Sequence, residues 1–175
     1  MAKQKLTPLA VAKNLLEIYG KALPIDVAGI TKAQGITIRM EELEDSVSGL
    51  LVIKANLITV GVNKSHHPNR QRFTIAHELG HFLLHGQETK IFVDDGPVVL
   101  FRNLASSEGT QRQEIEANIF AAALLMPEDI IREQLALQPI DAFDDMSVKH
   151  LAGQFGVSVR AITIRLTKLG LLDDW

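Results

Sequence analysis

The sequence predicts an α+β fold, in which helices surround one short, mainly antiparallel sheet and a helical tail follows. Strand-like runs occur only between residues 36 and 62, whereas apolar residues recur at helical spacing before and after them. With 175 residues, 46% of them hydrophobic and 22% charged, the chain suits one domain, or one domain with a small appendage.

Two helices and three strands are expected in the first part of the chain. The first helix runs from Thr7 to Gly20, because a capping hydroxyl precedes a proline and a glycine ends the pattern. The second runs from Asp26 to Gln34. The last two strands flank residues 54–56, which predicts a hairpin. The strands span Ile36–Met40, Gly49–Ile53 and Leu57–Val62.

The rest of the chain is predicted to be helical apart from one long loop. A long helix covers Asn69–His85, and the loop covers residues 87–109, where Gly96 and Pro97 stand among small polar residues. Proline and hydroxyl residues mark the starts of the later helices. These helices are Thr110–Leu125, Pro127–Leu137, Ser147–Phe155 and Ser158–Leu169.

Composition excludes several classes of protein. Eighteen basic against 21 acidic residues give a net charge of −3, which disfavours binding of nucleic acid by bulk positive charge. The absence of cysteine excludes disulfides, Fe–S clusters, thiolate zinc fingers and a cysteine nucleophile. The longest apolar run, Ile119–Met126, is too short to cross a bilayer, and the N-terminus lacks a signal-peptide pattern. We therefore expect a cytoplasmic protein without membrane contact.

The strongest chemical signal is the pentapeptide His77-Glu78-Leu79-Gly80-His81, which matches H-E-x-x-H. Residues four apart on a helix differ by only about 40°, so His77 and His81 project from one face and can share a Zn²⁺ ion. Glu78 lies close to such an ion without binding it. Gly80 is costly inside a helix, which indicates that another element passes close to the backbone there. The pentapeptide also occurs by chance, so a third ligand is needed.

Two glutamates on the helix Thr110–Leu125 are candidates for the third ligand. Glu114 is favoured, because Asn118 lies one turn further on the same face and can orient a ligand histidine. Glu116 points about 200° away and remains the alternative. His85 is about 12 Å from His77 along the helix, too far to share the ion. Two histidines and a glutamate predict a zincin-like core of the gluzincin type, in which a helix pair binds the metal.

Such a site has the chemistry of peptide hydrolysis. Three protein ligands leave one position for water, and Glu78 can take a proton from it and return one to the leaving amine. The strand Leu57–Val62 is expected to hold an extended substrate by strand addition. Mn²⁺ or Fe²⁺ are possible substitutes for Zn²⁺. No oxyanion donor stands out, since the three candidate arginines are more readily assigned to the surface or to salt bridges. They are Arg70, Arg72 and Arg102.

Two long blocks, Phe73–His85 and Glu114–Pro127, resemble the ImmA/IrrE family of metallopeptidases. The resemblance implies that His77 and His81 are zinc ligands and Glu78 the catalytic acid and base. It also implies a glutamate of the second block as third ligand, and the family pattern favours Glu114. Some family members cleave helix-turn-helix repressors and so derepress genes of mobile elements or of DNA damage. The expected substrate is therefore a specific intracellular protein, an Xre-type repressor or an antitoxin.

The last 30 residues are predicted to resemble a helix-turn-helix. Gly156 and Ser158 have the spacing of its turn and cap, and four polar residues could face a groove. From Met146 onward four basic and two acidic residues give +2, which is modest for DNA binding, so packing on the peptidase or a partner protein is favoured. We expect a peptidase domain in 1–145 and a tail in 146–175. The alternative is a non-catalytic, metal-stabilised regulator that binds DNA or a partner repressor through this tail. The four polar residues are Arg160, Thr163, Arg165 and Lys168.

Overall fold

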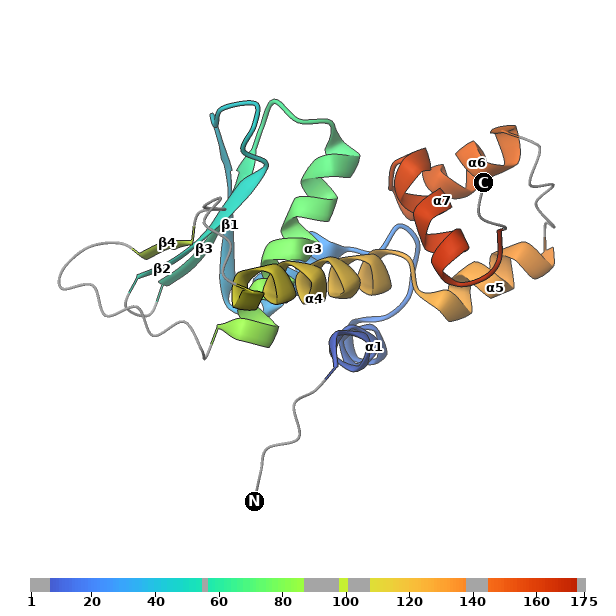
Figure 1. Cartoon of the computed structure of the whole chain (residues 1–175), viewed down its shortest axis with the longest axis horizontal. Helices are drawn as coiled ribbons and strands as arrows, with labels where there is room; N and C mark the ends of the chain where they lie inside the picture. Colours follow the sequence, from blue (N-terminus) through green and yellow to red (C-terminus); the bar gives the residue numbers. More distant parts are fainter. Residues whose placement is uncertain (1–6, 55–56, 87–97, 101–107, 138–144, 173–175) are drawn as a thin grey trace, which may run out of the picture.

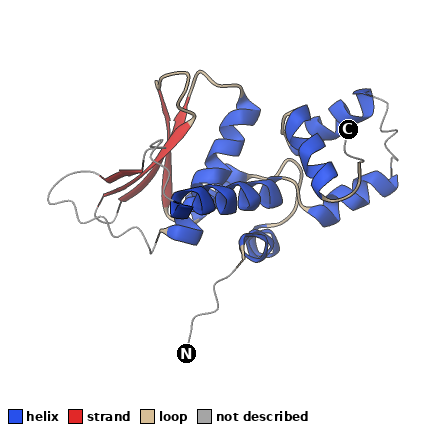
Figure 2. Cartoon of the chain, in the orientation of Figure 1, coloured by secondary structure: helices blue, strands red, loops and turns tan. Residues whose placement is uncertain are grey.

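A computed structural model describes residues 7–54, 57–86, 98–100, 108–137 and 145–172, which form helices and one sheet (Figure 1). This arrangement confirms the predicted α+β class. In the view of Figure 2 the described helices lie to one side of the sheet. The elements are α1 (Pro8–Tyr19), α2 (Val27–Ala33), β1 (Ile36–Glu41), β2 (Gly49–Lys54), β3 (Leu57–Asn63), α3 (Pro68–His85), β4 (Val98–Leu100), α4 (Glu108–Leu125), α5 (Glu128–Leu137), α6 (Asp145–Phe155) and α7 (Val159–Lys168).

Three helices start at the capping residues that the sequence predicts, whereas α4 and α6 begin before the predicted Thr110 and Ser147. The side chains of Thr7, Asp26 and Ser158 each accept a hydrogen bond from the backbone N–H three residues later, at 3.2, 2.9 and 3.1 Å. Helix α4 instead begins at Glu108, so Thr110 lies inside the helix and does not cap it. The prediction of a cap at Thr110 is wrong because the helix extends further toward the N-terminus.

The sheet has the strand order β1-β3-β2-β4. Strands β2 and β3 form the predicted antiparallel hairpin, and β4 adds to β2 in antiparallel orientation, with Leu51 opposite Leu100. Strand β1 pairs with β3 in parallel, so the sheet is mixed, with two of its three pairings antiparallel. Residues 98–100 were expected in a loop and form a strand. The parts of that expected loop at 87–97 and 101–107 lie outside the described residues.

Strand β3 lies in the interior of the sheet, which changes the expectation for substrate binding. Both of its edges are paired, one with β1 and the other with β2. Because an added strand needs a free row of backbone groups, Leu57–Val62 cannot hold a substrate by strand addition. The prediction is wrong because local sequence does not encode the order of strands.

Helix α3 lies at the centre of the molecule, between the sheet and α4. Seven consecutive residues, Thr74–Gly80, are buried, as the apolar flanks of the pentapeptide predict. Among the described helices, none is both long and apolar enough to cross a membrane. The hydrophobic core that surrounds α3 includes side chains from both ends of the chain. Its members include Leu15, Leu16, Val60, Leu79, Phe120, Leu124, Phe155, Ile162 and Leu166.

The tail packs against the rest of the chain through partly buried hydrogen bonds. Asn69 of α3 donates to the carbonyl of Val157 at 2.8 Å, and Arg72 donates to that of Gly156 at 3.1 Å. Arg165 of α7 turns inward and donates to the carbonyl of Met126 at 3.2 Å. Burial lowers the pKa of Arg165. Arg165 therefore does not face a groove, in contrast to the expectation from its helical spacing.

Candidate metal centre

His77 and His81 project from the same face of α3, as their spacing predicts. Their Nε2 atoms lie 3.0 Å apart, and the rings meet edge to face with centroids 4.6 Å apart. His77 is 2% exposed, whereas the side chain of His81 reaches the surface more. Two imidazole nitrogens are thus presented together on one face of α3, whose central turns are buried.

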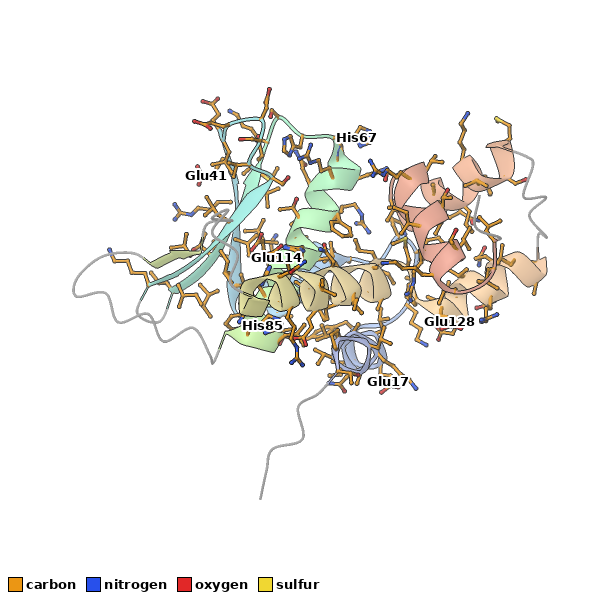
Figure 3. All side chains as sticks on the ribbon, viewed as in Figure 1. Glu17, Glu41, His67, His85, Glu114 and Glu128 are labelled. Atoms are coloured by element: carbon orange, nitrogen blue, oxygen red, sulfur yellow. The ribbon has the colours of Figure 1, made fainter. Side chains whose placement is uncertain are left out.

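Glu114 of α4 completes a cluster with the two histidines. Its carboxylate oxygens lie 3.4 Å from Nε2 of His77 and 3.1 Å from Nε2 of His81. One ligand atom from each of the three residues lies within 4.8 Å of the other two. Close contact with the imidazoles of His77 and His81 holds the pKa of Glu114 well below its usual range. In Figure 3 Glu114 lies where α4 passes in front of α3.

Glu116, the alternative third ligand, faces a different part of α3. Its carboxylate lies 3.5 Å from Nε2 of His85 and accepts a hydrogen bond from Nε of Arg112 at 2.8 Å. His85 is the last residue of α3 and is buried at 3% exposure. The two glutamates therefore sit beside different histidines, as their angular separation on the helix predicts.

The chemistry of the donor atoms fits a divalent cation. Nδ1 of His77 lies 3.1 Å from Oδ1 of Asn118, an oxygen that only accepts, so this nitrogen carries the proton and Nε2 is left with its lone pair. Ligand atoms at about 2.1 Å from one tetrahedral Zn²⁺ lie roughly 3.4 Å apart. The observed separations of 3.0 to 3.4 Å are close to this spacing. The contact predicted for Asn118 is present.

Glu78 is buried beside the cluster at 8% exposure. Together with His77 it lines a pocket of about 210 Å³. A carboxylate in this position is shielded from bulk solvent and borders a space that a substrate group can enter. The pocket also includes Ser48 and Gly49 at the start of β2. Ser48 could not be predicted from the sequence, because it is distant from the pentapeptide in the chain.

The two helices that carry the cluster, α3 and α4, approach closely at a glycine. A Cβ atom built on Gly80 would lie 2.8 Å from Cδ1 of Phe120 and 3.3 Å from Cα of Ala117. Only glycine allows α4 to come this near, which is the close approach that the sequence predicts at position 80. The contact fixes how α4 is placed on α3, and it therefore positions Glu114 relative to the histidines.

The fold and the cluster define a chain with a His-His-Glu set of possible metal ligands on a helix pair. A family model, that of the IrrE N-terminal-like domain of peptidase family M78, matches residues 31–167. The chain therefore belongs to this family of metallopeptidases, in agreement with the resemblance of the two sequence blocks.

Two curated relatives carry the same name. The radiation response metalloprotease IrrE of Deinococcus radiodurans is 39% identical over 75 residues, which cover 42% of this chain and 21% of the relative. Its counterpart in Deinococcus deserti is 39% identical over 74 residues, which cover 42% of this chain and 24% of the relative. The matched segment thus spans about a fifth to a quarter of the length of these relatives.

A solved structure supports the fold. A transcriptional regulator of Mycobacterium tuberculosis superposes with a TM-score of 0.63 at 18% identity, covering 91% of this chain and 46% of that chain. At this level of identity the likeness concerns the arrangement of helices and strands.

Proposed function

We propose that the chain is a zinc-dependent endopeptidase, with His77, His81 and Glu114 as metal ligands and Glu78 as the catalytic acid and base. The observation that carries the proposal is the convergence of the three ligand side chains within 4.8 Å, beside a buried glutamate on the same helix. Membership of a metallopeptidase family supports it. Mn²⁺ or Fe²⁺ can replace zinc in a site of two imidazoles and a carboxylate.

The residues of the site divide the work of peptide hydrolysis. When bound, the cation supplies Lewis acidity and a polarised water molecule. Glu78 accepts a proton from the attacking water and delivers it to the nitrogen of the leaving amine. Asn118 holds the ring of His77 in one orientation through Nδ1. Burial of Glu78 and His77 excludes competing solvent from the reacting groups.

The proposed substrate is a specific cytoplasmic protein, a helix-turn-helix repressor of the Xre type or an antitoxin, whose cleavage derepresses transcription. The names of the two Deinococcus relatives, which describe a radiation response, support a role in stress regulation. We further propose that residues 1–145 form the peptidase part and 146–175 a helix-turn-helix-like extension. The inward placement of Arg165 favours a packing role for this extension over DNA binding.

The test uses the zinc-loaded chain and its Glu78→Gln variant, added to a lysate of host cells. New protein N-termini are then identified by mass spectrometry. We expect about one zinc per chain in both proteins, and cleavage of one or a few regulators by the native chain alone. Glu17→Gln on the surface of α1 is the matched control and should cleave normally. Equal cleavage by Glu78→Gln would show that the peptidase assignment is wrong.

A further inference from the structure

The pocket beside Glu78 carries a positive charge that the proposed reaction does not use. The pocket lies along one face of α3, from His77 toward the N-terminus of the helix. The start of β2 closes its other side. Its volume of about 210 Å³ accommodates a side chain and not a folded segment. The lining residues are Ser48, Gly49, Arg70, Phe73, Thr74, His77 and Glu78.

Arg70 is held in place in this pocket although it is exposed. Its Nε and Nη2 atoms both donate to Oγ of Ser48, at 3.2 and 2.8 Å. Ser48 is itself anchored, because its carbonyl accepts a hydrogen bond from the backbone N–H of Asn63 at 2.9 Å. The side-chain amide of buried Asn63 also donates to three carbonyls of the preceding loop, residues 43–47. The guanidinium group is thus positioned by a rigid support.

The charge of Arg70 is not balanced by a carboxylate within the described parts of the chain. Its hydrogen bonds there go to a neutral hydroxyl, and no ion pair joins it to a described acidic side chain. Arg72, two residues further, differs because its guanidinium donates to the carbonyls of Ile25 and Gly156. If a dication is bound, the charges of Glu78 and Glu114 offset it, and the charge of Arg70 remains.

The position of Arg70 suits recognition of a substrate side chain rather than of the reacting carbonyl. Seven residues separate it from His77, which corresponds to roughly 10 Å along the helix axis. A guanidinium at this distance reaches a group that extends from a residue next to the scissile bond. Because it presents several N–H donors in one plane, its preferred partner is a carboxylate.

We propose that this pocket is a specificity subsite in which Arg70, oriented by Ser48, binds the carboxylate of an acidic residue adjacent to the scissile bond. The inference rests on the proposed peptidase function, since it assumes that a peptide lies across the metal-facing end of α3. It assigns Arg70 a role in selecting substrate and none in the chemical step.

The test measures binding to the zinc-loaded full chain by calorimetry at low ionic strength. The probes are short peptides that carry a zinc-binding hydroxamate either directly after or directly before a variable residue. That residue is glutamate, glutamine or lysine. Any free carboxyl terminus is amidated, so that the only carboxylate compared is that of the variable side chain. In one of the two series, we expect the glutamate probe to bind about tenfold more tightly than the glutamine probe. This factor corresponds to the lower end of the free-energy range for a hydrogen bond between charged groups.

Variants at the pocket connect this preference to Arg70. Arg70→Gln should abolish the glutamate preference, and Arg70→Glu should shift the preference to lysine. Ser48→Ala, which frees the guanidinium, should reduce the preference several-fold even if the Arg70 variants fold poorly. Arg39→Gln, an exposed arginine of β1 that does not line this pocket, is the matched control and should retain the preference.

Two failures can be distinguished. If the hydroxamates bind in a zinc-dependent manner but glutamate and glutamine probes bind equally, or if the preference persists in Arg70→Gln and Ser48→Ala, the subsite is refuted and the metal centre stands. If no hydroxamate binds more tightly to the zinc-loaded chain than to the metal-free chain, the metal centre is refuted together with the subsite that depends on it.

Discussion

Asn118 of α4 accepts a hydrogen bond from Nδ1 of His77 of α3, at 3.1 Å. The bond links the two helices that carry the cluster and fixes which nitrogen of His77 faces Glu114. Because the orientation of a ligand histidine depends on such partners, metal affinity depends on a residue that does not itself bind the metal.

Replacing Asn118 by alanine is therefore expected to weaken zinc binding by about 10–100-fold. The ring of His77 would lose its fixed orientation while all three ligand side chains stay present. Affinity is measured by competition with a chromophoric chelator. Asn14→Ala on the exposed face of α1 is the control. An affinity for zinc that is unchanged in Asn118→Ala would mean that the hydrogen bond does not orient His77.

The two glutamates of α4 are separated by a matched pair of variants. Glu114→Gln should lower zinc affinity by about 100-fold or more, because it removes a charged ligand candidate 3.1 Å from His81. Glu116→Gln should change the affinity by less than about threefold, since its carboxylate faces His85 and Arg112. Zinc content after gel filtration gives the answer. Retention of zinc by Glu114→Gln together with its loss in Glu116→Gln would reverse the assignment of the third ligand.

The close contact between α3 and α4 predicts opposite effects of the same substitution at two helical glycines. Gly80→Ala should reduce the free energy of unfolding by about 1–2 kcal/mol, because the clash with Phe120 outweighs the gain in helix propensity. Gly153→Ala in α6 should raise it by up to about 1 kcal/mol, since nothing lies within 4 Å of the added Cβ. Urea denaturation measures both values. Stabilisation by Gly80→Ala would show that the helices separate easily.

Features of the site that follow from helical periodicity could be predicted from the sequence. His77 shares a face of α3 with His81, and Glu114 shares a face of α4 with Asn118, because four residues separate the members of each pair. A glycine inside a helix indicates a close approach, which is observed at Gly80. Spacing alone does not decide which glutamate, Glu114 or Glu116, faces the two histidines. That choice depends on the rotation of α4 relative to α3, which is set by packing around Phe120.

Features that depend on distant pairing could not be predicted. The parallel pairing of β1 with β3 and the addition of β4 to β2 join segments whose local sequences do not specify their neighbours. The interior position of β3, and with it the error about a substrate edge, follows from this order. From the sequence, Arg70 is a candidate oxyanion donor that is more readily assigned to the surface or to a salt bridge. The role proposed for it here depends on Ser48, which is 22 residues away in the chain.

The tail offers a final comparison, between two arginines on α7 that have the same chemistry and similar helical context. Arg165 is partly buried and donates to the carbonyl of Met126 between α4 and α5, whereas Arg160 is exposed. Replacing Arg165 by alanine removes the hydrogen bond to the carbonyl of Met126. It also removes the packing of the aliphatic part of the arginine side chain.

Arg165→Ala should therefore lower the free energy of unfolding by about 1–3 kcal/mol, and Arg160→Ala should change it by no more than about 0.5 kcal/mol. Urea denaturation of the full chain measures both. Equal and small effects would indicate that the α7 contact contributes nothing to stability and that Arg165 is available to a partner. A selective loss in Arg165→Ala would instead mean that Arg165 joins the tail to the rest of the chain. DNA binding through α7 would then have to rely on its exposed basic residues, Arg160 and Lys168.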